Sequence, residues 1–341
     1  VPVGKPRAFQ DHALEGFQQV HRRGPGGCGR LAMQAGGVVV GELSQLAAFQ
    51  RGRLVDVRDG QRVVLYPRGL VVSERPVGQP HSAVGRLYGG DLAALTELAR
   101  IADATGIDQL VIPDHVVMGP HLENYPYGPF PLPLEEPWPE PLTVLAAMAG
   151  TSTRVRLGTG VLITPLRPAV LLAKTLATLD VLSRGRLEVG VGTGWQKEEY
   201  EAEGLDFTRR WQLFDDGLRA CRVLWRDAPA AFESPSVSFR ELWCLPRPVQ
   251  PGGPPLWFGV ALGPKNLARI AELGAGWIPM DSRPEALRSG IAKLRDSFRA
   301  AGRSFEGFGV RAHVGYVRGK DKSLDLDATL ASIPALVEAG A

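Results

Sequence analysis

The sequence has little cysteine and lacks a long apolar run. Its three cysteines, Cys28, Cys221 and Cys244, are odd in number and follow no metal-ligand spacing, which predicts no metal site and a reduced, cytoplasmic setting. No apolar run approaches the ~18 residues that a membrane span needs. The N-terminal stretch VPVGKPRAFQDH lacks the hydrophobic centre of a signal peptide. We therefore expect no membrane association.

The sequence also has little net charge. The formal net charge is +3 over 341 residues, with 22% charged and 44% apolar residues, which is ordinary for a globular protein. Such a balance does not indicate nucleic acid or an anionic membrane as a partner. The expected partner is a small-molecule substrate, and the chain allows a homodimer.

The first 80 residues differ from the rest in composition. They hold 11 Lys/Arg against 6 Asp/Glu and contain no motif. We interpret residues 1–80 as an N-terminal extension of unknown role and residues 81–341 as the main domain.

Histidine and lysine lack the positions that two common barrel chemistries need. The six histidines form no H-x-H or H-E-x-x-H pattern, which argues against a metal-dependent hydrolase. Lys174 and Lys293 fall within expected helices rather than at strand ends, which argues against a Schiff-base aldolase.

A glycine cluster is present, but it lacks the dinucleotide fingerprint. In GRLEVGVGTGW, residues 185–195, the glycines fall at 190, 192 and 194, and Trp195 follows. The fingerprint needs G-x-G-x-x-G running directly into a helix. The next residues, QKEEYEAEGLDF, are too polar and interrupted to form a packed crossover helix, so another explanation of the glycines is needed.

From about residue 83 the chain alternates short β-type runs with helical patterns. Strands are expected at 109–113, 154–164, 186–192, 254–260, 276–280 and 307–317, with a weaker one at 82–90. Helices are expected at 89–106, 141–152, 168–183, 209–227, 264–274, 284–302 and 326–340. Such alternation predicts parallel strands with right-handed crossovers. A doubly wound sheet and a (β/α)8 TIM barrel both satisfy it, and the number of units favours the barrel.

An eighth strand would follow Ala341, where the sequence ends. We interpret this as a barrel that lacks its last strand through C-terminal truncation. The alternative is that RVVLYPRGLVVS, residues 62–73, fills the gap, but no crossover helix accompanies that run.

In such a barrel, active sites gather at the C-terminal ends of the strands. These ends are expected at Asp114–His115, Thr159–Val161, Gly192–Trp195, Gly259–Gly263, Pro279–Asp281 and His313–Tyr316. Small residues let a flat ligand lie close to the rim. The glycines of 190–194 are therefore interpreted as room for a cofactor edge, with tight packing as the alternative.

Four motifs in this order resemble a known family. They are VIPDHVV, TRVRLGTGVLITPLRPAVLLAKTLATLDVLSRGRLEVGVGTGWQKEEYEAEGLDF and its helix RRWQLFDDGLRACRVLW, PRPVQPGGPPLWFGV, and LARIAELGAGWIPM. Together they are similar to the bacterial luciferase-like superfamily, within its coenzyme F420 (deazaflavin)-dependent oxidoreductase branch. Relatives that use FMN share much of the pattern. The resemblance implies a luciferase-like barrel that transfers hydride between reduced F420 and a small organic substrate.

The resemblance also implies site residues. A non-prolyl cis peptide, Gly160–Val161, would bulge against the central ring of the cofactor, and Asp114 and His115 would form the catalytic polar pair beside it. A His at this place is suited to give or take a proton. The loop before the helix at 264 would bind the cofactor phosphate. The expected cofactor-binding residues are Thr159, Gly160, Val161, Gly192, Thr193, Gly194, Trp195, Gly259, Gly263 and Lys265.

Two alternatives to F420-dependent hydride transfer stay open. One is an FMN-dependent luciferase-like monooxygenase, and the other is a degenerate, non-catalytic copy that binds flavin poorly. The proline-rich loop of residues 119–141 carries Tyr125, Tyr127, Phe130 and Trp138. We expect it either to cover the substrate or to form a rigid surface crossing.

Overall fold

The computed structural model describes residues 94–105, 107–315, 317–320 and 325–341 of the chain. The expected strand at 82–90, the run at 62–73 and the boundary at residue 80 lie outside the described residues.

Parallel strands form the central sheet, in the order β1–β2–β4–β7–β8–β9. They are β1 (Gln109–Ile112), β2 (Arg156–Thr159), β4 (Leu187–Gly192), β7 (Leu256–Phe258), β8 (Gly276–Trp277) and β9 (Gly309–Val310), and β3 (Leu162–Ile163) pairs with β4 beside this path. All the strands expected after residue 106 are thus confirmed, although most are shorter than expected. Every residue of β1 and β4 is buried, as in parallel sheets covered on both faces.

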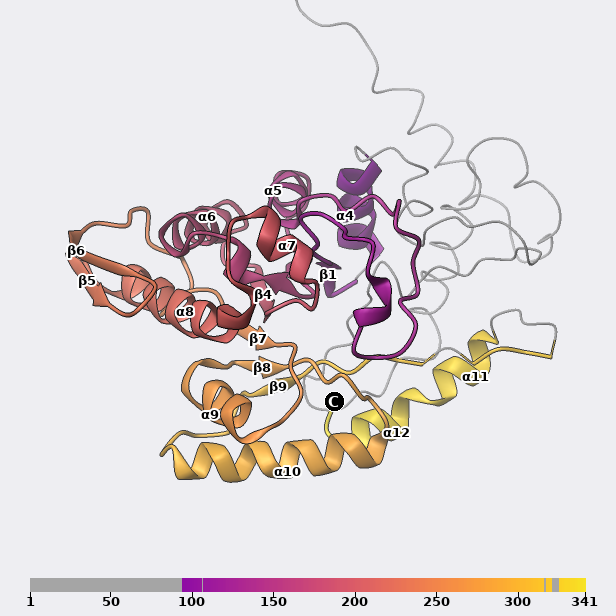
Figure 1. Ribbon diagram of the computed structural model, residues 1–341. Helices are drawn as coiled ribbons and strands as arrows, with labels where there is room; N and C mark the ends of the chain where they lie inside the picture. Colours follow the sequence, from indigo (N-terminus) through magenta and orange to yellow (C-terminus); the bar gives the residue numbers. More distant parts are fainter. Residues whose placement is uncertain (1–93, 106, 316, 321–324) are drawn as a thin grey trace, which may run out of the picture. The chain divides into compact units, whose positions relative to one another are not determined.

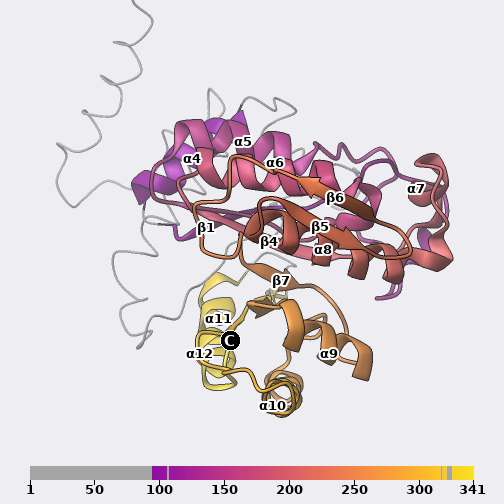
Figure 2. The ribbon, with the colours of Figure 1, turned by 90° about the vertical axis from the view of Figure 1, so that its left-hand side faces the viewer.

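Helices connect successive strands and cover the outside of the sheet. They are α4 (Ala94–Thr105), α5 (Pro141–Thr151), α6 (Ala169–Leu182), α8 (Arg210–Arg226), α9 (Pro264–Leu273) and α10 (Pro284–Ala300), followed by α11 (Leu326–Ala331) and α12 (Ile333–Glu338). Figures 1 and 2 show α4, α5 and α6 beside β1–β4, and α9 and α10 beyond β7–β9. The single helix expected at 326–340 is divided at Ser332. No helix in the described part of the chain combines the length and apolarity needed to cross a bilayer.

The sheet is curled, because side chains from distant strands meet inside it. Glu188 on β4 accepts hydrogen bonds from Gln109 on β1 and from Arg311 just after β9, both at 2.8 Å. Those strands are two and three places from β4 in the sheet, where neighbours stand about 4.8 Å apart. A curled parallel sheet with helices outside is the architecture expected for an incomplete (β/α)8 barrel.

The strand expected at 154–164 is broken in two. β2 ends at Thr159 and β3 begins at Leu162, and the peptide bond between them, Gly160–Val161, is cis, as predicted. A 3-10 turn, η2 (Thr164–Leu166), then leads to Arg167.

The structure adds elements that the sequence did not indicate. A hairpin of β5 (Ala230–Glu233) and β6 (Ser238–Leu242) lies beside α8 (Figures 1 and 2). As expected, the polar stretch after Trp195 forms no crossover helix. It does form the short helix α7 (Lys197–Ala202), followed by η3 (Phe207–Arg209). One turn, η1 (Leu122–Asn124), lies in the proline-rich loop.

Candidate active site

A cavity of ≈ 290 Å³ lies at the C-terminal ends of the strands, where barrel enzymes place their sites. Four strand ends line it, with Pro113–His115, Gly160–Val161, Gly192–Trp195 and Gly259–Ala261. The other lining residues are Tyr125, Pro126, Tyr127, Phe130, Trp138, Ile163, Trp211, Asn266 and Met280. Segments far apart in the sequence therefore converge on one hollow.

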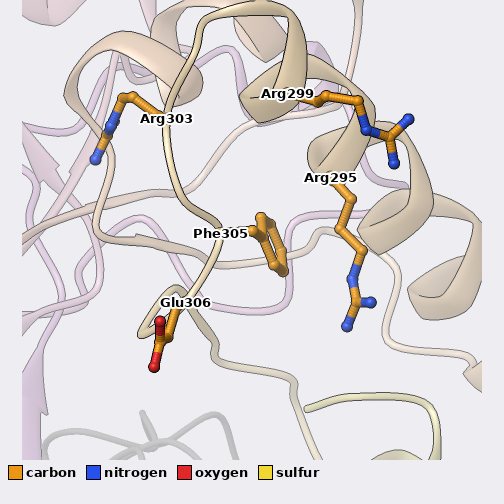
Figure 3. Close-up of a pocket in the computed structure, with 5 residues that line it drawn as sticks. All are labelled: Arg295, Arg299, Arg303, Phe305 and Glu306. Carbon is orange, nitrogen blue, oxygen red and sulfur yellow. The ribbon is translucent and has the colours of Figure 1, made fainter.

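A second hollow, of ≈ 480 Å³, lies at the opposite end of the sheet. It is bordered by the last turns of α10 and the segment that enters β9 (Figure 3). Its lining residues are Arg295, Arg299, Arg303, Phe305 and Glu306. Arg303 donates to the carbonyls of Ala271 and Gly274 at the end of α9, so it serves the fold there. The cavity at the strand ends is therefore the candidate site.

The half-buried side chain of Val161 is held between two glycines. A Cβ on Gly192 would lie 2.7 Å from Val161 Cγ2, and one on Gly259 would lie 2.4 Å from Val161 Cγ1. Both distances are far below van der Waals contact, so only glycine allows Val161 this position. The space that these glycines leave is thus taken by Val161, which itself faces the cavity.

Asp114 is tied to the segment that follows the cis peptide. Its side chain is 1% exposed, and its Oδ2 accepts hydrogen bonds from the Ile163 backbone N–H at 2.8 Å and from Arg167 Nη1 at 2.7 Å. Arg167 Nη2 donates to Oδ1 at 3.1 Å, and also to Glu140 Oε1 at 2.9 Å. Burial lowers the pKa of Arg167, but the two carboxylates outweigh it and raise that pKa. The charge of Asp114 is therefore compensated.

His115 pairs with a carboxylate that the sequence analysis did not select. Its Nδ1 lies 3.1 Å from Oε2 of Glu199, which is fully buried on α7. Glu199 Oε1 accepts the backbone N–H of Val116 at 2.9 Å. Because a carboxylate can only accept a hydrogen bond, Nδ1 of the imidazole carries the proton that lies between them. Within the described residues no protein group bonds Nε2, the other ring nitrogen, so the cavity-lining ring keeps one nitrogen for a ligand.

The same face of α7 anchors two other parts of the site. Gln196 bonds both backbone groups of Gly119, at 2.8 and 3.0 Å, and the Tyr200 hydroxyl donates to the Thr193 carbonyl at 2.5 Å. Burial raises the pKa of Tyr200, which keeps this hydroxyl protonated. Glu199 and Tyr200 lie three and four residues after Gln196, which is the spacing of side chains on one face of a helix. This spacing is the sequence signal from which the buried face could have been found.

Aromatic side chains from the proline-rich loop form one wall of the cavity. The His115 ring lies 4.6 Å from Trp138 between centroids. Tyr125 and Phe130 lie 5.3 and 5.2 Å from Trp195, which comes from the end of β4. The loop therefore lies over the strand ends and lines the cavity, and its covering of a substrate stays a prediction.

Three of the expected cofactor-binding residues do not line the cavity. Thr159 is fully buried, and its Oγ1 donates to the Gly190 carbonyl at 2.7 Å between the strands. Gly263 immediately precedes α9, and Lys265 is exposed in the first turn of that helix. The expected roles of these three residues stay predictions.

Comparison with known proteins fits this architecture. The model of the luciferase-like monooxygenase family matches residues 71–332, so the chain belongs to this family and is an oxidoreductase enzyme. It is 33% identical to an uncharacterized protein of Mycobacterium tuberculosis over 213 residues, which are 60% of this chain and 73% of the other.

Solved structures share the fold. The monooxygenase RslO1 from Streptomyces bottropensis is similar with a TM-score of 0.60 and 24% identity, over 82% of this chain and 78% of that chain. The coenzyme F420-dependent tetrahydromethanopterin reductase from Methanopyrus kandleri has a TM-score of 0.51 and 20% identity, over 68% and 65% of the two chains. A monooxygenase and an F420-dependent reductase therefore share this fold.

Proposed function

We propose that this protein transfers hydride between reduced coenzyme F420 and a small organic substrate in the cavity at the strand ends. The observation that carries the proposal is His115, which lines the cavity with Nδ1 held by buried Glu199. Reduction of a carbonyl by hydride needs a proton at the oxygen, and an imidazole fixed in this way is suited to deliver it.

The residues around the cavity fit a planar ring. Val161 is fixed between Gly192 and Gly259, while Thr193, Gly194 and Trp195 line the adjoining wall. Flat, mostly apolar walls with few polar groups are typical of cofactor sites. Bound there, reduced F420 would supply a hydride to the substrate, and the chain's own residues would orient the substrate, exclude water and deliver the proton.

Asp114 acts through the backbone in this proposal. Its carboxylate binds the N–H of Ile163 and the guanidinium of Arg167, so it fixes the segment that follows Val161. Asp114 is then a positioning residue for the wall against which the ring lies, and His115 is the catalytic residue.

The cofactor tail is proposed to leave the cavity toward α9. Gly259 and Asn266, which precede and follow Gly263 in the sequence, line the cavity, and Lys265 is exposed in the first turn of α9. The free N–H groups of a helix start and a nearby ammonium suit a phosphate. The similarity in fold to an F420-dependent reductase supports this choice of cofactor.

FMN-dependent monooxygenation is the second candidate. The family model and RslO1 both carry the name monooxygenase, which supports it.

Cofactor titration is the experiment that tests the proposal. The purified chain is titrated with F420 and with FMN, and quenching of the cofactor fluorescence reports binding. We expect micromolar affinity for F420. Micromolar affinity for FMN without F420 binding would overturn the choice of cofactor. Failure to bind either would support the degenerate copy and overturn the proposal. Trp243→Ala, at a side chain 61% exposed after β6, is the control that should bind as the parent does.

A further inference from the structure

We propose that the substrate is an uncharged carbonyl compound with an apolar group. Its oxygen faces His115 and its apolar group lies against Tyr125, Phe130 and Trp195. This inference rests on the proposed function and deepens it, because it names the class of substrate that the cavity accepts.

The first argument is the charge of the cavity wall. Among the described residues that line it there is no lysine or arginine, and the ionisable groups are Asp114, His115, Tyr125 and Tyr127. Both oxygens of Asp114 are engaged by Arg167, and a proton charge on His115 would be matched by Glu199. Burial raises the pKa of Tyr127, and Tyr125 raises it further, so this phenol stays neutral.

A charged substrate would therefore lose its hydration without gaining a partner among the described residues of the wall. Burying an unpaired ion costs several kcal/mol, whereas a neutral carbonyl needs only one hydrogen bond. This part of the wall thus selects against phosphates, carboxylates and ammonium groups on the part of the substrate that lies inside the cavity.

The second argument is the aromatic wall. Tyr125, Phe130 and Trp195 contact one another, with ring centroids 5.1 to 5.3 Å apart, and His115 lies 6.0 Å from Trp195. An apolar group placed there removes apolar area on both sides from water, which stabilises binding by ~25 cal/mol per Å². An aromatic cluster also binds cations, but no free carboxylate lines this cavity to assist one.

The third argument is size. The cavity of ≈ 290 Å³ is at the lower limit of ligand sites, and it has to accept the reacting ring of a cofactor as well. Only the reacting end of a substrate fits beside that ring. The rest of the apolar group would extend toward Tyr127, whose side chain is 54% exposed at the cavity mouth.

The reaction balances with the groups named. The C=O π bond of the substrate would break as its carbon receives the hydride of reduced F420, and the oxygen would take the Nε2 proton of the His115 imidazolium, whose charge Glu199 balances. The product is the alcohol. The deazaflavin, oxidised by two electrons, would release its ring N–H proton to solvent, and His115 would take one proton from solvent in return.

Three ketones of one shape test the charge argument. They are acetophenone, the anion 4-acetylbenzoate and the cation 4-acetyl-N,N,N-trimethylanilinium, reduced by the full chain with F420. We expect kcat/KM for acetophenone to exceed both others by about 30-fold or more, since each charge would lie on the apolar group, against Tyr125, Phe130 and Trp195, where no described lining side chain pairs with it. Equal or better turnover of either ion would overturn the inference.

A series of methyl ketones tests the aromatic wall. From acetone to 2-hexanone, kcat/KM should rise about fourfold for each added methylene, the value for burying one such group. Phe130→Ala should flatten this rise, whereas Trp243→Ala, an aromatic deletion outside the cavity, should keep the full rise. A rise that is equally steep in Phe130→Ala would overturn the placement of the apolar group.

Binding measured without turnover separates this inference from the proposed function. Saturation-transfer NMR reports whether each of the three aromatic ketones binds the chain. If F420 fails to bind, the proposed function falls while the ketone binding still decides the substrate class. If F420 binds and the charged ketones bind best, only the substrate class falls.

Discussion

The guanidinium of Arg167 contacts both carboxylate oxygens of Asp114, at 2.7 and 3.1 Å, in a nearly buried pair. Replacing Arg167 with Met would leave that carboxylate buried without its counter-charge. We expect the free energy of unfolding, measured in urea, to fall by about 3–5 kcal/mol, the usual cost of breaking a buried ion pair.

The double variant Asp114→Asn/Arg167→Met removes both charges and should recover a large part of that loss. Arg283→Met, at a side chain 71% exposed, should change the stability by less than ~1 kcal/mol. A double variant as unstable as Arg167→Met alone would contradict the importance of the pair.

Glu199 is expected to act through His115. Glu199→Gln keeps an oxygen for the Val116 N–H but removes the negative charge beside Nδ1. We expect kcat to fall by about 100-fold, the lower range of general acid–base effects, and the pH profile of kcat to shift, with KM and cofactor affinity nearly constant.

The matched control for this change is Glu198→Gln, one residue earlier in α7 and 25% exposed. It should leave kcat and its pH profile as they are. A merely structural role of Glu199 would instead lower the stability and leave the pH profile of the remaining activity unchanged.

Gly259→Ala tests the position of the Val161 side chain between Gly192 and Gly259. The new Cβ would lie 2.4 Å from Val161 Cγ1, so the valine has to move toward the cavity. Overpacking of this kind costs about 1–3 kcal/mol. We expect weaker cofactor binding by fluorescence titration and a lower unfolding free energy.

The second substitution Val161→Ala in this background should restore stability but not cofactor binding, because the ring loses its wall. Gly150→Ala in α5 is the control, since its Cβ would meet nothing within 4 Å. Unchanged cofactor affinity in Gly259→Ala would contradict the proposed place of the ring.

Arg186 is expected to be a structural residue. Its Nε and both terminal nitrogens donate to neutral oxygens of Ala149, Ser152, Val155 and Ser183, at 2.7 to 3.2 Å, and burial lowers its pKa. Arg186→Met leaves these carbonyls without donors and should cost about 2–4 kcal/mol of unfolding free energy. Arg184→Met, two residues earlier on the exposed turn, should have little effect.

Asp103 makes stability depend on pH. Burial raises the pKa of its carboxyl, but hydrogen bonds from the backbone N–H groups of Val155, Thr153 and Arg154 outweigh this and bring the pKa to about 2. A depressed folded pKa stabilises the fold above the unfolded value of ~3.9 and loses that effect as the pH falls toward 2.

We therefore expect Asp103→Asn to lower the unfolding free energy at pH 7 by about 1 kcal/mol, a modest figure because the carboxylate is partly solvated. Urea unfolding of parent and variant between pH 5 and pH 2 checks this, since the difference should shrink across that range. A constant difference would mean that the charge of Asp103 does not stabilise the loop.

Local sequence was sufficient for most of the framework. The apolar runs and helix signals predicted the parallel strands β1, β2, β4, β7, β8 and β9 and their crossover helices, because each depends on short-range periodicity. The break in the strand at Gly160–Val161 came from the family resemblance, and the periodicity alone predicted one continuous strand there.

The site was predictable only in part. Asp114, His115, Gly192 and Gly259 were expected at strand ends and do line the cavity. Arg167 and Glu199 were not selected, because neither stands at a strand end. Their partners are 53 and 84 residues away in the sequence, and no local pattern encodes such a pairing.

The sequence by itself determined the alternation of strands and helices, the position of Asp114 and His115 after β1, and the glycines at the ends of β4 and β7. Only the tertiary structure decided what these residues contact. Curling of the sheet brings Val161 between the two glycines and α7 against His115, since three-dimensional packing, and not neighbourhood along the chain, selects the partner of each buried group.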